Sequence, residues 1–99
     1  MSETVAAQAL TPRSRVLQTA DDAIHGDRNT HYGTPTENFE RISKLWSVYL
    51  GRNVSPRDVA MLMILLKVAR GMNLLTEDTM VDIAGYAACG WECETQVVA

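Results

Sequence analysis

Two aspartates four residues apart, Asp78 and Asp82, are candidates for metal chemistry in this 99-residue chain. Asp82 lies inside the apolar run MVDIAGYAAC, where a carboxylate is costly unless a cation, a hydrogen-bond network or a metal compensates its charge. Residues four apart lie on the same side of a helix, so the two carboxylates repel each other and would gain from a shared divalent cation. The alternative is that Asp82 forms a buried ion pair with a lysine or an arginine.

Lys67 and Arg70 are the natural cationic partners for Asp82. Lys67 stands in the middle of the run MILLKVA, where a lysine either extends to solvent, pairs with a buried carboxylate or binds a phosphate. At about 100° per residue, both cations lie on the side of their helix opposite Leu62 and Leu65. They are therefore candidates for phosphate binding as well as for a structural ion pair.

Glu37 and Glu40 have the ExxE spacing that places two carboxylates on adjacent helical turns, an arrangement suited to magnesium. A second explanation competes with it. Arg41 and Lys44 each follow one of these glutamates by four residues, the favourable orientation for exposed ion pairs. At about 100° per residue both glutamates point away from the apolar stripe of their helix, whereas Asn38 lies at its edge. The spacing alone favours a solvated face, although a second subunit could complete a metal site there.

The segment GDRNTHYGTPT, residues 26–36, is rich in turn-forming residues and is expected to be a loop that carries function. Four of its side chains could contact a phosphate or a base, or cap helices: Asp27, Arg28, His31 and Tyr32. The segment has no Walker or GxGxxG pattern, and no histidine or cysteine stands at a ligand spacing from His31. The chain has no GxSxG motif and no local Cys–His pair, so nucleophilic catalysis has no support.

Helices must position these side chains, since no segment alternates with the period of a strand. Apolar spacing and capping residues predict four helices, over residues 11–26, 36–50, 55–71 and 76–95. Thr36 is the expected N-cap of the second helix. Ser55 and Asp58 fit a capping box at the start of the third.

Composition restricts the class of protein. With 46% hydrophobic and 21% charged residues, the chain has the balance of a soluble globular domain. Residues 1–10 lack a cap and an amphipathic stripe, so a loose arm is expected before a single all-α domain over residues 11–99. A net charge of -3 argues against a general nucleic-acid binder. No apolar run is long enough to span a membrane and the N-terminus does not resemble a signal peptide, so a cytoplasmic protein is expected.

Cys89 and Cys93, four residues apart, are expected to be reduced thiols that pack as small apolar side chains. The helices over residues 55–71 and 76–95 are apolar nearly all round, and a chain of 99 residues cannot bury two such helices by itself. Association through these helices is therefore expected, with a symmetric homodimer as the commonest outcome.

The composite pattern of residues 26–88 resembles a widespread family of small bacteriophage proteins. It consists of GDR-x-x-x-YG-x-P-x-x-NF-x-x-I-x-x-LW, followed by DVA-x-x-MILLK-x-AR and VDIAGYAA. Members are often described as similar to MazG, the all-α nucleoside triphosphate pyrophosphohydrolases, which form dimers or tetramers with sites near subunit contacts. In these enzymes ExxE on one helix and ExxD on a later one hold magnesium, and a water activated there cleaves the triphosphate.

The resemblance implies an all-α, four-helix MazG-like bundle that is completed by dimerisation. Glu37 and Glu40 match the ExxE motif, and Asp82 matches the aspartate of ExxD. Tyr86, four residues later, matches an aromatic residue that lies near the base in several MazG-like enzymes. One position departs from the pattern: the glutamate of ExxD would stand at position 79, where this chain has Thr79.

The first hypothesis is therefore a pyrophosphohydrolase that converts a ribo- or deoxynucleoside triphosphate to the monophosphate and pyrophosphate with Mg²⁺ or Mn²⁺. Asp78 or Glu77 would replace the missing glutamate. The resemblance and the residue types together assign catalysis to Glu40 and Asp82, metal binding to Glu37, Glu40, Asp78 and Asp82, phosphate binding to Lys67 and Arg70, and base binding to Tyr86, Trp46 and Tyr32. Two alternatives stay open: a non-catalytic protein that binds a nucleotide or a host protein, and a helical interaction protein in which the Asp82 ion pair is structural.

Overall fold

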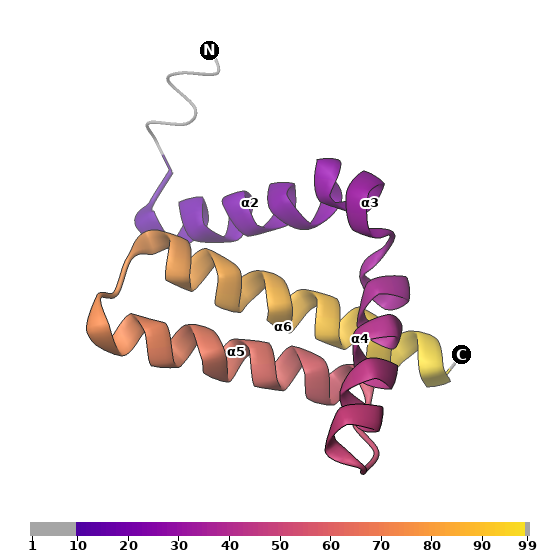
Figure 1. Ribbon diagram of the computed structural model, residues 1–99. Helices are drawn as coiled ribbons and strands as arrows, with labels where there is room; N and C mark the ends of the chain where they lie inside the picture. Colours follow the sequence, from indigo (N-terminus) through magenta and orange to yellow (C-terminus); the bar gives the residue numbers. More distant parts are fainter. Residues whose placement is uncertain (1–9, 99) are drawn as a thin grey trace.

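The computed structural model describes the backbone of residues 10–98 and the side chains of residues 10–26 and 29–95. These residues form α-helices and no strand: α2 (Pro12–His25), α3 (Asp27–Tyr32), α4 (Pro35–Leu50), α5 (Pro56–Asn73) and α6 (Glu77–Val98) (Figure 1). The all-α class and the four predicted helices are confirmed, and the short helix α3 is an addition to them. The expected N-terminal arm lies outside the described residues, apart from Leu10.

Helices α2, α4 and α5 begin in the same way, with a hydroxyl residue followed by proline. The side-chain oxygens of Thr11, Thr34 and Ser55 each accept a hydrogen bond from the backbone N–H three residues further on. Proline has no N–H to satisfy, and its fixed φ suits the first helical position. In α5 the Asp58 carboxylate also accepts a 3.0 Å hydrogen bond from the Ser55 N–H, which confirms the predicted capping box.

The segment of residues 26–36 is more ordered than the loop that its composition predicts. It contains α3 and the first residues of α4. The N-cap of α4 is Thr34 rather than Thr36, because Pro35 takes the first helical position and Thr34 accepts from the first turn. Gly33 joins the two helices with φ of 83°, a left-handed conformation that favours glycine.

Helix α6 is the centre of the fold, with α2 packed along one side and α5 along the other (Figure 1). Helix α4 crosses its C-terminal half. The hydrophobic core lies at this crossing and consists of Phe39, Val54, Val59, Ala60, Cys89 and Cys93. Gly90 allows α5 and α6 to approach closely, since a methyl group at position 90 would lie 2.6 Å from the Cβ of Ala60.

Most of the large apolar side chains lie outside this core. The largest fully buried side chains are Val59 and Cys93, whereas every leucine of the chain is at least 38% exposed. The outer side of α5 carries a continuous apolar surface, here called the α5 face: Met61, Leu62, Leu65, Leu66, Val68 and Met72, which are 40–85% exposed. Within the described range, no helix has both the length and the apolar character needed to cross a membrane.

Candidate functional site

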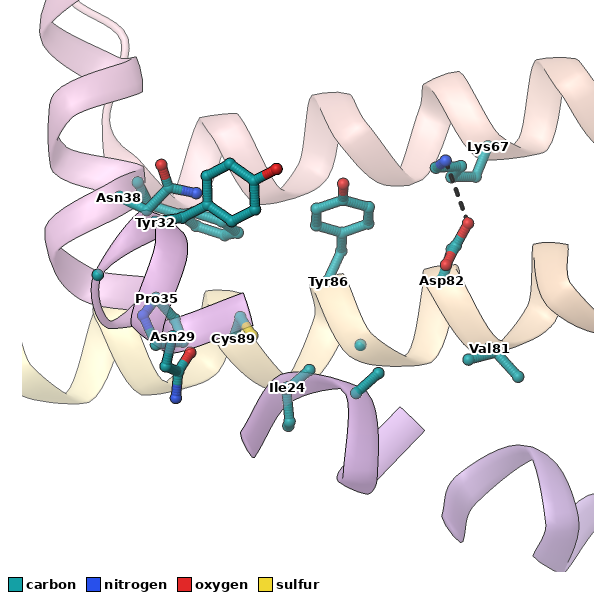
Figure 2. A pocket seen from close by; sticks show the side chains of 14 residues that line it. Ile24, Asn29, Tyr32, Pro35, Asn38, Lys67, Val81, Asp82, Tyr86 and Cys89 are labelled. Carbon is teal, nitrogen blue, oxygen red and sulfur yellow. Dashed lines mark ion pairs between the residues drawn. The ribbon is translucent and has the colours of Figure 1, made fainter. Parts of the chain in front are cut away.

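A pocket of about 170 Å³ lies where α6 meets the other four helices (Figure 2). Helix α6 lines it with one side of the VDIAGYAA motif, through Val81, Asp82, Gly85 and Tyr86, and with Cys89, which follows the motif. Their three- and four-residue spacing places these side chains on one face of the helix. The motif predicted to bear on function therefore forms one wall of a pocket.

Lys67 of α5 and Asp82 of α6 form an ion pair at one end of this pocket, with 3.1 Å between Nζ and Oδ2 (Figure 2). The two side chains are only 18% and 33% exposed, so each charge is compensated largely by the other. The predicted pairing of Asp82 with a cation is thus confirmed, and Lys67 provides the cation. Arg70, the other candidate, is exposed and does not line the pocket.

Aromatic rings line the pocket between α4 and α6. The rings of Phe39 and Tyr86 are stacked, with centroids 6.2 Å apart and planes inclined by 29°. Tyr32 projects from α3 and is 56% exposed, so it forms part of the rim. Trp46, predicted as a base contact, does not line the pocket and packs against the hydrophobic core instead. Of the three predicted base contacts, the structure therefore brings Tyr86 and Tyr32 together.

Helix α3 carries residues of the predicted loop to the pocket. Asn29 and Tyr32 line it, whereas His31 is exposed and lies against Tyr32 with ring centroids 6.3 Å apart. The side chains of Asp27 and Arg28 lie outside the described residues. Helix α3 thus brings the amide of Asn29 and the phenol ring of Tyr32 to the pocket.

Two asparagines, Asn29 and Asn38, line the pocket although sequence reasoning assigned neither to the site. Asn38 is half-buried, and its side-chain amide has no hydrogen-bond partner among the described residues. The available signal was its position at the edge of the apolar stripe of α4, next to Phe39. A half-buried amide with a free donor and a free acceptor can bind a polar ligand.

The predicted metal ligands do not come together within one chain. Only Asp82 lines the pocket, where Lys67 compensates its charge, and Asp78 is exposed. No three His, Cys, Asp or Glu side chains in the described part of the chain are placed to hold a single metal ion. The donor set therefore does not fit a Mg²⁺ or Mn²⁺ site inside one chain.

The ExxE glutamates lie on the solvent side of α4, as the helical periodicity predicts. Glu37 and Glu40 are exposed and do not line the pocket. The expected ion pairs with Arg41 and Lys44 are absent among the described side chains. This face of α4 is solvated rather than paired.

A second, wider hollow of about 450 Å³ adjoins the pocket and shares Asn29 and Cys89 with it. Its charged lining is acidic, because Asp21 and Glu92 lie there together with His25. The His25 Nδ1 atom lies 3.3 Å from the Asp21 Oδ1 atom. This hollow disfavours an anionic group.

Cys89 and Cys93 are free thiols with exposed fractions of 8% and 1%. Burial raises the pKa of the Cys93 thiol, because the thiolate would lose its hydration. Both side chains belong to the hydrophobic core, so the prediction of reduced, packed cysteines is confirmed.

Comparison with known proteins places this pocket within a matched region. The sequence model of a domain of unknown function, DUF6378, matches residues 15–94. The chain is 53% identical over 74 residues to the Gene 55 protein of Mycobacterium phage L5 and 48% identical over 75 residues to that of Mycobacterium phage D29. These matches cover 73% and 75% of the chain but 47% and 50% of the relatives, so it spans about half the length of the curated relatives it matches. No solved structure matches it.

Proposed function

The chain belongs to the DUF6378 family, which includes proteins of mycobacteriophages, and from this premise we propose that it binds a nucleotide, with the base in the pocket and the phosphates beside Lys67. One observation carries the proposal: a single pocket combines stacked aromatic rings, the free amide of Asn38 and the Lys67 ammonium. Aromatic faces stack on bases, amides hydrogen-bond to base edges, and an ammonium attracts phosphate.

The size of the pocket supports a base rather than a whole nucleotide inside it. Sites that enclose a drug-sized ligand measure roughly 300–1,000 Å³. An apolar cavity of about 150 Å³ holds a benzene molecule. The pocket of about 170 Å³ therefore accommodates one ring, and the sugar and phosphates must lie outside it.

The charges around the pocket support one direction for the phosphates. At one side the adjoining hollow is lined by Asp21 and Glu92, which would repel them. At the other end lies Lys67, with Arg70 one turn further along α5. A bound phosphate would compete with Asp82 for the Lys67 ammonium, so binding exchanges one anionic partner for another.

Calorimetric titration with the eight common ribo- and deoxynucleoside triphosphates, in EDTA to prevent turnover, tests this function. We expect binding of at least one nucleotide, weakened about tenfold or more by Lys67→Met and by Tyr86→Ala. Lys44→Met, which removes an exposed lysine outside the pocket, is the matched control and should leave the affinity unchanged. Absence of binding to every nucleotide by a folded sample would refute the proposal.

Hydrolysis of the bound nucleotide to the monophosphate and pyrophosphate is a second candidate function. It is supported by the MazG resemblance of the ExxE and VDIAGYAA motifs and by the entry of Asp82 into the pocket. A metal site of this kind would require carboxylates from more than one chain, because Glu37, Glu40 and Asp78 lie apart from Asp82. The test is pyrophosphate release with Mg²⁺ or Mn²⁺, with Asp82→Asn as the control. Binding without release would favour the non-catalytic alternative.

The α5 face supports a homodimer as the functional form. Between Val59 and Met72 the charged residues of α5 are Lys67, which points into the pocket, and Arg70. Contiguous apolar surfaces beyond a few hundred Å² are uncommon on monomers. The α5 face extends from Met61 to Met72, about 18 Å along the helix axis, and continues into the exposed Leu74 and Leu75. A second copy packed on it would remove these apolar side chains from water.

The order of the apolar residues supports a second copy of the chain as the occupant. Met61, Leu65, Val68 and Met72 follow one another at intervals of four, three and four residues, the spacing of a helix–helix seam. The pattern reads the same in both directions. A two-fold axis between Leu65 and Val68 would place Met61 against Met72 of the partner subunit and would bury the face against itself.

A further inference from the structure

We propose that Asn38 reads the edge of the base and that the pocket selects a single six-membered ring, a pyrimidine. This assignment rests on the proposed nucleotide binding. It extends that function by naming the class of base and the residue that distinguishes it.

Asn38 is one of three polar side chains of the pocket, with Asn29 and Tyr86, for which the described part of the chain provides no hydrogen-bond partner. Lys67 and Asp82 compensate each other, and Tyr32 stands at the exposed rim. Asn38 is half-buried in the first turn of α4, and its amide has no hydrogen bond within the described part of the chain. The amide is still accessible from the pocket, so its donor and its acceptor are available to a ligand that offers the complementary pair.

The position of Asn38 suits the edge of a ring that stacks in the pocket. It precedes Phe39, whose ring stacks on that of Tyr86. In Figure 2 Asn38 projects from α4 and Tyr86 from α6, and both side chains line the pocket. Asn29 lines both the pocket and the adjoining acidic hollow, whereas Asn38 lines only the pocket. Asn38 is therefore better placed than Asn29 to contact a base.

The chemistry of an amide matches the edges of pyrimidines. Cytosine presents an amino donor beside a ring-nitrogen acceptor, and uracil and thymine present a ring N–H donor beside a carbonyl acceptor. An asparagine can satisfy either edge with two hydrogen bonds by turning its amide. Adenine and guanine offer the same kinds of donor–acceptor pair, so the choice of a pyrimidine rests on the size of the pocket and not on the amide. The pocket of about 170 Å³ accommodates one ring, so the second ring of a purine would extend beyond it, into the adjoining hollow or into solvent.

The experiment is a titration of the wild-type protein and of Asn38→Asp with dCTP, dTTP, dATP and dGTP in EDTA. The wild-type protein should bind dCTP and dTTP more tightly than the purine nucleotides. A carboxylate only accepts hydrogen bonds, so it keeps the bond to the amino group of cytosine or to the ring N–H of thymine and sets its second oxygen against an acceptor of either base. Asn38→Asp should therefore weaken dCTP and dTTP binding about five- to a hundredfold each, and purine nucleotide binding less.

Two further variants separate base reading from a structural role. Asn38→Leu removes both the donor and the acceptor and should weaken dCTP and dTTP equally. Asn53→Asp makes the same chemical change at an exposed position outside the pocket and should alter neither affinity. Thermal melting of each variant verifies folding.

The outcomes distinguish the two levels of the argument. Binding of purine nucleotides as tightly as pyrimidine nucleotides would overturn the single-ring assignment. A uniform loss across all four nucleotides in a folded Asn38→Asp variant would overturn the role of Asn38 while leaving nucleotide binding in place. Failure of the wild-type protein to bind any nucleotide would overturn the proposed function, and this inference with it.

Discussion

Helices α2 and α5 flank the same central helix, yet their outer sides differ in chemistry (Figure 1). The outer side of α2 is polar, with a Gln18–Asp22 hydrogen bond and a His25–Asp21 contact. The α5 face is apolar from Met61 to Met72. The side of the fold formed by α2 is thus polar and the side formed by α5 is apolar, and this difference is the basis of the proposed homodimer.

The largest expected effect is on self-association, when a charge is placed on the outer side of α5 and, for comparison, on α2. Leu65 on α5 and Leu17 on α2 are 60% and 64% exposed, so they differ in surroundings rather than in exposure. Leu65→Lys would put an unpaired ammonium into the proposed dimer interface and should raise the dissociation constant at least a hundredfold, about 2.7 kcal/mol. Leu17→Lys should leave association unchanged. Light scattering on the eluting protein should show twice the 10.9 kDa chain mass for wild type and Leu17→Lys.

This pair of variants can also contradict the comparison. A monomeric wild-type protein at tens of micromolar would remove the second copy as the occupant of the α5 face. Equal effects of Leu65→Lys and Leu17→Lys would show that the two sides do not differ in function. A helical circular dichroism spectrum and a cooperative melting transition for both variants would verify that neither result reflects unfolding.

A second comparison concerns how tightly α6 packs against its two neighbours. A methyl group at Gly90 would lie 2.6 Å from the Ala60 Cβ on α5, whereas one at Gly85 would lie 3.4 Å from the Ile24 Cγ2 on α2. Gly90→Ala should therefore destabilise the protein by about 1–3 kcal/mol through overpacking. Gly85→Ala should be neutral or stabilising by up to about 1 kcal/mol, since alanine favours the helix. Urea denaturation of both variants measures the difference, and equal free energies of unfolding would contradict it.

A third comparison concerns the ion pairs on the two sides of α6. Lys67–Asp82 ties α5 to α6 with exposed fractions of 18% and 33%, and Arg15–Glu77 ties α2 to α6 with fractions of 49% and 46%. Lys67→Met should cost about 1–3 kcal/mol, less than breaking a fully buried pair, because it leaves the Asp82 carboxylate half-buried and unpaired. Arg15→Met should change the melting temperature little, as exposed pairs do.

The Lys67–Asp82 pair also separates a structural role from a functional one. If the pair is structural, Asp82→Asn should lower the melting temperature as Lys67→Met does, and nucleotides should not alter either. If Lys67 serves a ligand, Asp82→Asn should free the ammonium and keep or improve nucleotide binding. A melting temperature unaffected by both substitutions would exclude the purely structural interpretation.

The helices could be predicted from the sequence because their signals are local. The Thr-Pro and Ser-Pro starts at Thr11 and Ser55 combine a side-chain cap with a residue suited to the first turn. The start of α4 was misplaced by two residues because Thr34 and Thr36 flank the same proline. The short helix α3 was missed, since six residues between glycines carry no periodic pattern.

The candidate site could be predicted only in part, because its contacts depend on how helices cross. Lys67 and Arg70 were equal partners for Asp82 until the packing of α5 on α6 selected Lys67. Trp46 shares the apolar stripe of α4 with Phe39, but the crossing with α6 turns Phe39 toward the pocket and leaves Trp46 against the core. Asn38 was located correctly on its helix, whereas its missing partner is a property of the tertiary structure.

The smallest expected effect is on stability in acid. It involves one carboxylate at the contact between α2 and α6, Glu77, and one in the N-terminal cap of α5, Asp58. A hydrogen bond from Arg15 lowers the pKa of Glu77, and the backbone hydrogen bond from Ser55 lowers the pKa of Asp58. Both groups have lower pKa values folded than unfolded, so their stabilisation is present above the unfolded values of 4.5 and 3.8. This stabilisation is lost as the pH falls through the pKa values of the folded state.

The melting temperature of wild type should therefore decline below about pH 4.5. Glu77→Gln and Asp58→Asn should each flatten that decline, because an amide does not titrate in this range. An unchanged acid profile in both variants would show that neither the α2 tie nor the α5 cap governs the acid limit of the fold.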